Sequence, residues 1–506
     1  MPRNLSPLLI LALLAVPVAA GAEEQDQEQS SEAALPRLGQ APGEPQVRSA
    51  PPSIPFGIPP AQSAENVLDF HGYMLLPLRI GVLKRRHPLE GQSATTLHMP
   101  PLVPQYERSF NYTGVLPDPW IQMNFTYGNS TVSGTAIIAA RATTDGSGVY
   151  IPTDQLGVYD AFVTVNLSKP FKTPVQVKIG AITGRYGVMG AFDAGRYGTP
   201  LIARTNSVGE MITAALDLGP TTKLLIEQGF GGQVARPPVG LIPAGWNDFA
   251  DPNVGASFVN QIHAGISHAN LVQLGLHYLT AWTQDDQGPS GQVPDGRISV
   301  YGADARLTAG RAGHLYGGIA RTVAVNSEPV AGVIEVLNAR GGPELISEYL
   351  GPDSGGDGSL TTFGAQYDLS VARLVYGKAY IGKSPDVLVS LFGIGTNVSS
   401  DDPAYDGVLK LKAGAQATYN IKSWLSASMR FDHVSPDVDN SRTAFNIYSP
   451  AILLHTDWQS RDEIALQYSH FVYGSEVPVR TGYPPVQDPT AVPDKDVFML
   501  SGTFWW

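Results

Sequence analysis

The chain ends in the stretch DVFMLSGTFWW, residues Asp496 to Trp506, where every second position holds a large apolar residue or glycine. Counted back from the end, these positions are Trp506, Phe504, Gly502, Leu500 and Phe498. Because a β-strand sends successive side chains to opposite faces, the alternation predicts a strand with one apolar face. Aromatic residues at both ends of that face are typical of strands that cross a membrane. The stretch therefore predicts the closing strand of a membrane β-barrel.

The bulk composition narrows the classes to which this chain can belong. Charged residues make up only 15% of the 506 residues, and the formal net charge is −12. An acidic chain lacks the basic surface that phosphate backbones require, so no nucleic-acid partner is expected. The chain contains no cysteine, which excludes a disulfide framework and thiolate metal sites.

The N-terminus carries the pattern of a secretory signal. Arg3 precedes an apolar stretch from Leu8 to Val16, and Ala20-Gly21-Ala22 is an A-x-A cleavage site. We therefore expect residues 1–22 to be a signal peptide. Residues 23–66 are rich in Glu, Gln and Pro, which predicts a disordered periplasmic linker. This linker is either a plain spacer or a tail that contacts peptidoglycan or a partner.

From Val67 onward the sequence alternates with a period of two. The stretch VLDFHGYMLLPLRIG (67–81) alternates over more than ten residues, and 408–419, 424–433 and 463–473 also alternate. Strand-length segments of alternating hydrophobicity are typical of membrane barrels. We expect an all-β, transmembrane antiparallel β-barrel over residues 67–506.

The connections between these segments are of two kinds, which alternate along the chain. Short polar turns are expected at 128–129, 168–173, 219–222, 268–270, 310–313, around 370, 420–423 and 459–463. Long polar connections are expected at 81–118, 143–157, 188–206, 233–255, 284–296, 326–359, 398–406, 434–445 and 476–494. Eight turns and nine long connections predict about 18 strands, within a range of 16–20, as in outer-membrane barrels. This interpretation treats 372–397 as one strand, with a turn at Lys383-Ser384-Pro385 as the alternative.

A barrel of this size encloses a lumen, and the alternation assigns polar residues to it. The face opposite the apolar one is expected to carry Asp69, Arg79, Lys178, Gln273, His277, Lys410, Lys412, Gln416, Ser426, Ser428, Arg430 and Glu463. Cations outnumber anions in this set, and charged rings determine the ion preference of pores. The set therefore predicts a channel that tolerates anions.

The third long connection is the predicted pore constriction. The segment 184–206 is rich in glycine and contains Arg185, Arg196, Arg204 and Asp193. In porins the third external loop folds into the barrel and narrows it, and the field of arginines there is focused by the low-dielectric walls. The alternative is a surface loop whose arginines pair with nearby carboxylates.

Both ends of the predicted barrel resemble known families. The terminal strand resembles that of bacterial outer-membrane barrels, whose final aromatic residue is read by the barrel assembly machinery. Asp69-Phe70-His71-Gly72-Tyr73 and the final Trp505-Trp506 resemble the two ends of maltoporin-type sugar porins. The resemblance implies a homotrimer of 18-stranded barrels that passes maltodextrins along aromatic rings, with Tyr73 and Trp505 as two of them. The chain departs from the family at Leu75, where family members have a sugar-binding arginine.

The sequence predicts neither catalysis nor a bound cofactor. His263 and His268 lie five residues apart without the spacing of a metal site, and no nucleophile elbow occurs. A soluble propeller would show a repeat of about 40–50 residues, and none is found. We therefore expect a porin of the bacterial outer membrane, in contact with its lipid, for passive diffusion of small hydrophilic solutes, with sugars as the implied class. The alternatives are a plugged barrel that serves in surface structure or adhesion and, third, a hydrolase within the barrel.

Overall fold

The computed structural model describes the strands of the barrel and most of its short turns. The described residues are 65–81, 120–144, 150–167, 173–191, 201–232, 257–269, 271–283, 296–325, 334–337, 343–344, 357–377, 385–401, 403, 406–455, 462–475 and 496–505. All of them belong to one compact unit, Pro45–Trp506. The predicted signal peptide and nearly all of the predicted linker lie outside the described residues, so both stay predictions.

The described secondary structure is almost entirely β. The strands are β1 (Val67–Gly81), β2 (Trp120–Gly128), β3 (Val132–Thr144), β4 (Tyr150–Asn166), β5 (Val175–Ala191), β6 (Leu201–Asp217), β7 (Thr222–Gly232), β8 (Ser257–His268), β9 (Val272–Thr283), β10 (Arg297–Thr308), β11 (His314–Val325), β12 (Ile334–Leu337), β13 (Pro343–Glu344), β14 (Gly358–Ser370), β15 (Asp386–Ser400), β16 (Leu409–Lys422), β17 (Leu425–Ser435), β18 (Phe445–His455), β19 (Glu463–Tyr473) and β20 (Asp496–Trp505). The short helices are η3 (Gly310–Ala312), α4 (Val371–Tyr376) and η5 (Ser441–Thr443). Within the described part of the chain, no helix is both long and apolar enough to cross a membrane.

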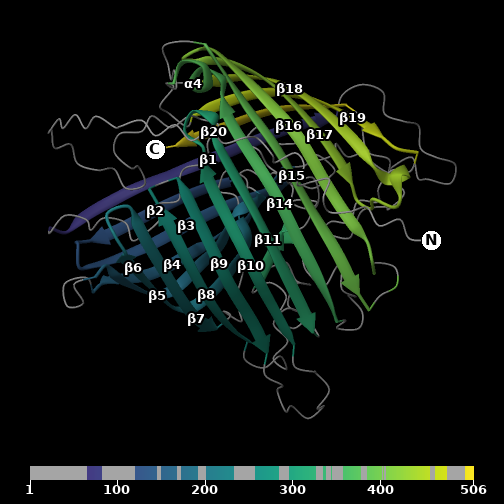
Figure 1. Ribbon diagram of the computed structural model, residues 1–506. Helices are drawn as coiled ribbons and strands as arrows, with labels where there is room; N and C mark the ends of the chain where they lie inside the picture. Colours follow the sequence, from purple (N-terminus) through teal and green to yellow (C-terminus); the bar gives the residue numbers. More distant parts are fainter. Residues whose placement is uncertain are drawn as a thin grey trace. The chain divides into compact units, whose positions relative to one another are not determined.

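The strands form one antiparallel sheet that closes on itself. Each strand pairs with the next along the chain, except that β11 pairs directly with β14, and β14 to β17 run side by side in green in Figure 1. The ring closes where β1 pairs with β20, with Tyr73 opposite Trp505 and Ile80 opposite Phe498. Of the 20 strands that the structure describes, all but β12 and β13 belong to this ring, which leaves 18. The prediction of an 18-stranded antiparallel barrel closed by the terminal strand is confirmed.

The two ends of the barrel differ in their connections, as predicted. Short links such as 129–131 and 218–221 join strands at the end where β1 begins and β20 finishes, which we call the short-turn end. The links at the opposite, long-connection end are longer in most cases. The connection between β3 and β4 is shorter than the expected 143–157, because β3 runs to Thr144 and β4 begins at Tyr150.

The expectation of one strand over 372–397 is wrong. Ser370 ends β14, and its hydroxyl accepts a hydrogen bond from the backbone N–H of Arg373, which caps the start of α4. Gly377 then ends the helix with φ of 75°, a left-handed conformation that favours glycine. The next strand, β15, begins only at Asp386, whose carboxylate accepts hydrogen bonds from Ser370 Oγ and from the N–H of Ala372.

Candidate functional site

The two faces of the barrel wall differ sharply in polarity. Leu78, Leu276 and Phe498 are 54%, 65% and 44% exposed, whereas Lys412 and Arg430 are 0% and 2% exposed. On β17 the 45% exposed Met429 adjoins Arg430, and successive side chains of a strand point to opposite faces. The exposed apolar and the buried charged side chains therefore lie on opposite faces of the sheet. An exposed apolar face around a closed barrel is the surface that suits lipid. The buried polar face is therefore the inner one.

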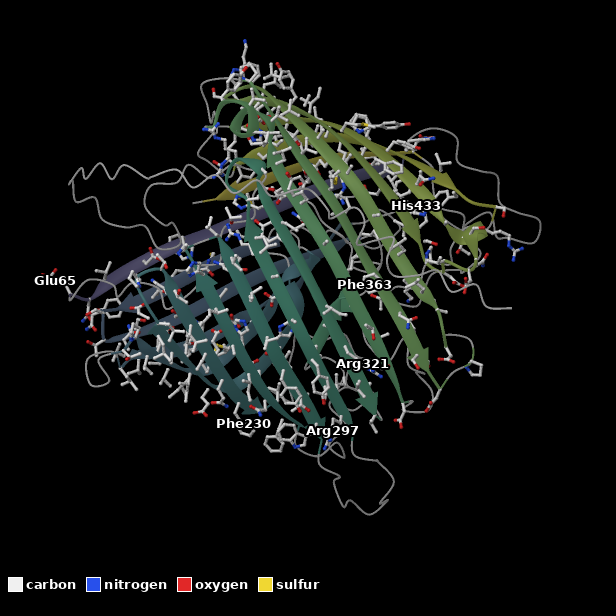
Figure 2. All side chains as sticks on the ribbon, viewed as in Figure 1. Glu65, Phe230, Arg297, Arg321, Phe363 and His433 are labelled. Carbon is white, nitrogen blue, oxygen red and sulfur yellow. The ribbon has the colours of Figure 1, made fainter. Side chains whose placement is uncertain are left out.

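Aromatic side chains gather on the outer face near the long-connection end. The rings of Phe230, Phe258 and Trp282, on β7, β8 and β9, pack with centroid distances of 5.8–6.4 Å. Figure 2 labels Phe230 at the end of β7. Aromatic girdles mark the level where a membrane barrel meets the polar headgroups. This cluster therefore has the position expected at one membrane interface.

A hairpin made of the upper parts of β5 and β6 leaves the wall. The pairing of β4 with β5 ends at Ala161 and Ala181, and the pairing of β6 with β7 ends at Val208 and Gly232. The pairing of β5 with β6 continues well beyond both points, as far as Ala191 and Leu201. Residues 182–191 of β5 therefore have no backbone pairing with β4, and residues 201–207 of β6 have none with β7. We call these two stretches, which pair with each other, the inner hairpin.

The path of β5 takes the inner hairpin inside the barrel. Cα atoms of β5 come within 8 Å of Cα atoms in β9, β10, β11 and β14. These strands are not its neighbours in the sheet, and β14 lies seven places further round the ring. A strand can approach so many distant parts of a closed ring only across its interior. The inner hairpin therefore narrows the lumen.

The connection between β11 and β14 adds a third strand to the inner hairpin. β12 pairs antiparallel with the free edge of β6, with Ile334 opposite Thr205 and Glu335 opposite Arg204. β13 in turn pairs with β12. Two connections that start at different places on the ring thus meet in one small sheet.

The predicted constriction residues fall on this hairpin or just beyond it. Arg185 and Arg204 are direct partners in the register of β5 and β6. Arg196 and Asp193 lie outside the described residues. The expectation of a loop over 184–206 is wrong for both flanks, because β5 continues to Ala191 and β6 begins at Leu201. These flanks pair with each other, with an irregular register between Tyr186 and Ala191, and this pairing gives a glycine-rich segment a strand conformation.

The predicted polar residues of the lumen lie in three settings. Lys410 and Lys412 are buried on the inner face of β16, and Arg430 is buried on β17. Asp69 is partly exposed and lies 2.8 Å from His71 Nδ1, and Lys178 Nζ lies 5.2 Å from the ring centre of Phe162. In the backbone register Arg79 lies opposite Met499, and Tyr73 lies opposite Trp505. Their roles in solute passage stay predictions.

The sequence reasoning missed the acidic partner of Arg430. The Asp432 carboxylate accepts hydrogen bonds from Arg430 Nη2 at 2.9 Å and from Nε at 2.9 and 3.1 Å, and neither side chain is more than 2% exposed. The guanidinium carbon lies 4.8 Å from the ring centre of Phe392, and this ring packs over Gly414, where a Cβ would come within 2.5 Å of it. The i, i+2 spacing of Arg430 and Asp432 on one strand face was the available signal.

A second missed feature is an apolar area on the inner face. Val434, Phe445, Ile447, Ala451, Leu453, Ala465, Phe471, Val497 and Met499 form a buried cluster, with Tyr473 packed against it. It covers part of β17 to β20. In β18, apolar residues such as Ile447 and Ile452 occupy both faces, so the polarity pattern did not indicate an apolar area on the inner face.

The third missed feature is a hydrogen bond between strands that are not neighbours. Thr205 Oγ1 of β6 donates to Gln261 Oε1 of β8 at 2.6 Å, across the intervening β7. Both side chains are buried. No local pattern in the sequence could have paired residues 56 positions apart.

The histidines of the described residues lie beside carboxylates, hydroxyls or amides. His263 Nδ1 lies 2.8 Å from Glu227 Oε2, and His268 Nδ1 lies 2.8 Å from Thr222 Oγ1. His263 and His268 are therefore not brought together. Across the described part of the chain, no group of three or more His, Cys, Asp or Glu side chains could hold a metal ion.

Comparisons with known proteins give no family assignment by sequence. No protein-family model matches the chain. No curated protein matches it either. Among solved structures, a BenF-like porin from Pseudomonas fluorescens Pf-5 is similar with a TM-score of 0.40 and 9% identity, covering 88% of this chain and 99% of that one.

Two further solved structures have the same degree of similarity. The outer membrane channel DcaP of Acinetobacter baumannii has a TM-score of 0.38 and 10% identity, covering 88% of this chain and 98% of that chain. The trimer form of OmpT, an outer membrane protein of Vibrio cholerae, has a TM-score of 0.35 and 9% identity, covering 87% and 99%. Because these TM-scores are below 0.5, the fold assignment rests on the strand pairing of this chain.

Proposed function

We propose that this protein is a bacterial outer-membrane porin through which small hydrophilic solutes diffuse passively. The observation that carries the proposal is a closed 18-stranded ring whose outer face is apolar and whose inner face is largely polar, apart from the apolar area on β17 to β20. A ring of this size leaves a water-accessible lumen unless chain segments fill it. No reaction chemistry is part of the proposal.

The inner hairpin supplies the selectivity in this proposal. Arg185 and Arg204 occupy one register position of the hairpin, and Arg196 and Asp193 belong to the segment that joins its strands. Arginines beside the narrowest water path favour anions, because low-dielectric walls focus their field. We infer that the channel prefers anions despite the acidic total charge.

Sugars are the solute class that the two chain ends support. Tyr73 and Trp505 are direct partners where β1 closes on β20, so the backbone brings together the two residues that resemble the aromatic row of sugar porins. If they form a stacking surface, maltodextrin should block the ion current. Tyr73→Ala combined with Trp505→Ala should then weaken the block while leaving the unblocked current unchanged. Equal block of the variant and the unaltered protein would refute the sugar assignment.

A plugged barrel with a structural or adhesive role is the second candidate. Inner-face side chains on β14 to β20 are buried; Gln366 is 1% exposed and Lys412 is 0% exposed. This burial favours the plugged barrel, because a wide water-filled lumen would leave such groups exposed. A homotrimer embedded in the outer membrane through the barrel assembly machinery is compatible with either function. Blue-native electrophoresis of the purified protein tests the trimer.

Planar-bilayer recording of the purified protein separates the two functions. A porin gives stepwise, steady current that scales with salt concentration, and reversal potentials in a KCl gradient report its ion preference. A plugged barrel gives no steps although the protein is folded, which electrophoresis with and without heating establishes. Absence of current from folded protein would overturn the porin proposal.

A further inference from the structure

Among the described residues, a buried side-chain hydrogen bond reaches from the inner hairpin across one strand to the wall. Thr205 belongs to the part of β6 that has left β7, since their pairing ends at Val208 and Gly232. Its hydroxyl nevertheless reaches Gln261 on the inner face of β8, with an oxygen–oxygen distance of 2.6 Å. Thr205 is 0% exposed and Gln261 is 5% exposed. The contact therefore joins the hairpin to a wall strand two places away.

Glycines on β6 and β7 clear the space for this contact. At Gly229 a Cβ would lie 2.3 Å from Gln261 Nε2, so any larger residue would displace the glutamine side chain. At Gly231 a Cβ would lie 2.7 Å from the carbonyl oxygen of Val208, and at Gly209 it would lie 2.0 Å from that of Phe230. Because Gly229 and Gly231 carry no side chains, β6 can bend inward over β7 and the Gln261 side chain can extend across β7.

β12 holds the same part of β6 from its other side. Ile334 pairs with Thr205 itself, and Val336 pairs with Ala203. Thr205 is thus fixed by its backbone to β5 and β12 and by its side chain to β8. It is one of the points at which the small inner sheet is joined to the wall. Thr183 Oγ1, which donates to Asp160 Oδ1 of β4 at 2.8 Å, is another.

We propose that Gln261, acting through Thr205, is the positioning residue that sets the width of the pore. The hydrogen bond holds the inner hairpin against β7 and β8, and loss of the bond lets the hairpin move within the lumen and changes the free cross-section. The proposal rests on the proposed porin function. The proposal goes further in that Gln261, a residue of the wall strand β8, determines the conductance although it lies outside the segment that narrows the lumen.

The test is a double-mutant cycle recorded as single-channel current. Thr205→Val and Gln261→Met each remove the hydrogen bond while nearly preserving side-chain volume. Each should shift the equilibrium between detached and docked hairpin by roughly 2- to 13-fold, the effect of one net hydrogen bond. This equilibrium is measured as the ratio of the times that the channel spends at its two conductance levels. The double variant should resemble either single variant, because the two residues act through one bond.

Thr362→Val is the matched control. Thr362 is also a buried inner-face threonine, and its hydroxyl lies 3.1 Å from that of Thr396 on the neighbouring strand. The Thr362→Val variant should lose a comparable hydrogen bond and keep the conductance of the unaltered protein. Gly229→Ala should reproduce the effect of Gln261→Met, because the new Cβ displaces the glutamine.

A cross-link keeps the proposal testable if these variants fold poorly. The chain has no cysteine, so Thr205→Cys with Gln261→Cys can be joined by a short bis-maleimide without side reactions at other thiols. The cross-linked protein should retain the narrow conductance level only. Conductance equal to that of the Thr362→Val control in every variant, cross-linked or not, would overturn the inference, whereas no current from folded unaltered protein would instead overturn the porin function.

Discussion

The wall around β16 to β18 and the inner hairpin are both antiparallel sheet, yet they are held in place differently. Each wall strand has two partners along nearly its whole length, and the pairings continue round the ring. In the inner hairpin, 182–191 no longer pairs with β4 and 201–207 no longer pairs with β7. The hairpin is held by β12, by the Thr205–Gln261 bond and by a hydrogen bond from Thr183 Oγ1 to Asp160 Oδ1 of β4. Substitutions in the wall should therefore change stability, and substitutions in the hairpin should change the current.

The largest expected effect is on the wall, at the buried pair of Arg430 and Asp432. Asp432→Ala leaves a buried guanidinium without its carboxylate, and breaking such a pair typically lowers the free energy of unfolding by about 3–5 kcal/mol. Urea unfolding of the protein in lipid vesicles, followed by tryptophan fluorescence, measures the change. Arg430→Met with Asp432→Leu is the control and should be much closer to the unaltered protein. A single variant as stable as the control would show that the wall does not depend on this pair.

The outer face of the closing strand gives the next effect. Leu500 lies midway along β20 and is 43% exposed on the apolar face. Leu500→Arg places a charge where lipid is expected and should lower the free energy of unfolding by about 2–4 kcal/mol at the bilayer midplane. Leu271→Arg, in the turn between β8 and β9, should cost no more than about 1 kcal/mol because it lies near an interface. Equal costs at the two positions would contradict the assignment of the lipid-facing side.

The inner hairpin should show the smallest change in stability and a clear change in current. Arg185→Ala with Arg204→Ala should alter the free energy of unfolding by no more than about 0.5 kcal/mol, as is usual away from packed cores. Removal of two cations beside the water path should raise the single-channel conductance and lower the anion preference measured by reversal potential. Arg297→Ala, an exposed arginine at the start of β10 labelled in Figure 2, is the control. An unchanged reversal potential would remove these arginines from the pore.

The wall could be predicted because its determinants are local. Period-two alternation in stretches such as 67–81 and 463–473 follows from one face meeting lipid, and short polar turns separate the segments. The count of eighteen strands and the pairing of the terminal strand with 67–80 followed from these local signals and are confirmed.

The strand conformation of the hairpin and the helix α4 could not be predicted, because they depend on distant partners or on short signals. Gly184, Gly187 and Gly190 give the upper part of β5 the composition of a loop, and only its pairing with β6 makes it a strand. The segment VARLVY reads as an apolar strand, although the cap from Ser370 starts a helix of 6 residues. Gln261 lies 56 residues from Thr205, so their contact follows from the closed ring and from the bend of β6.

The central claim is that a conducting lumen is narrowed by the inner hairpin, and the single-channel conductance of a hairpin deletion tests it most directly. Residues 184–205 would be replaced by a short Gly-Ser turn, leaving the wall pairings of β5 and β6 below Val208 in place. The account predicts that the folded variant conducts with larger steps and weaker ion preference than the unaltered protein. Steps of unchanged size and preference would contradict it.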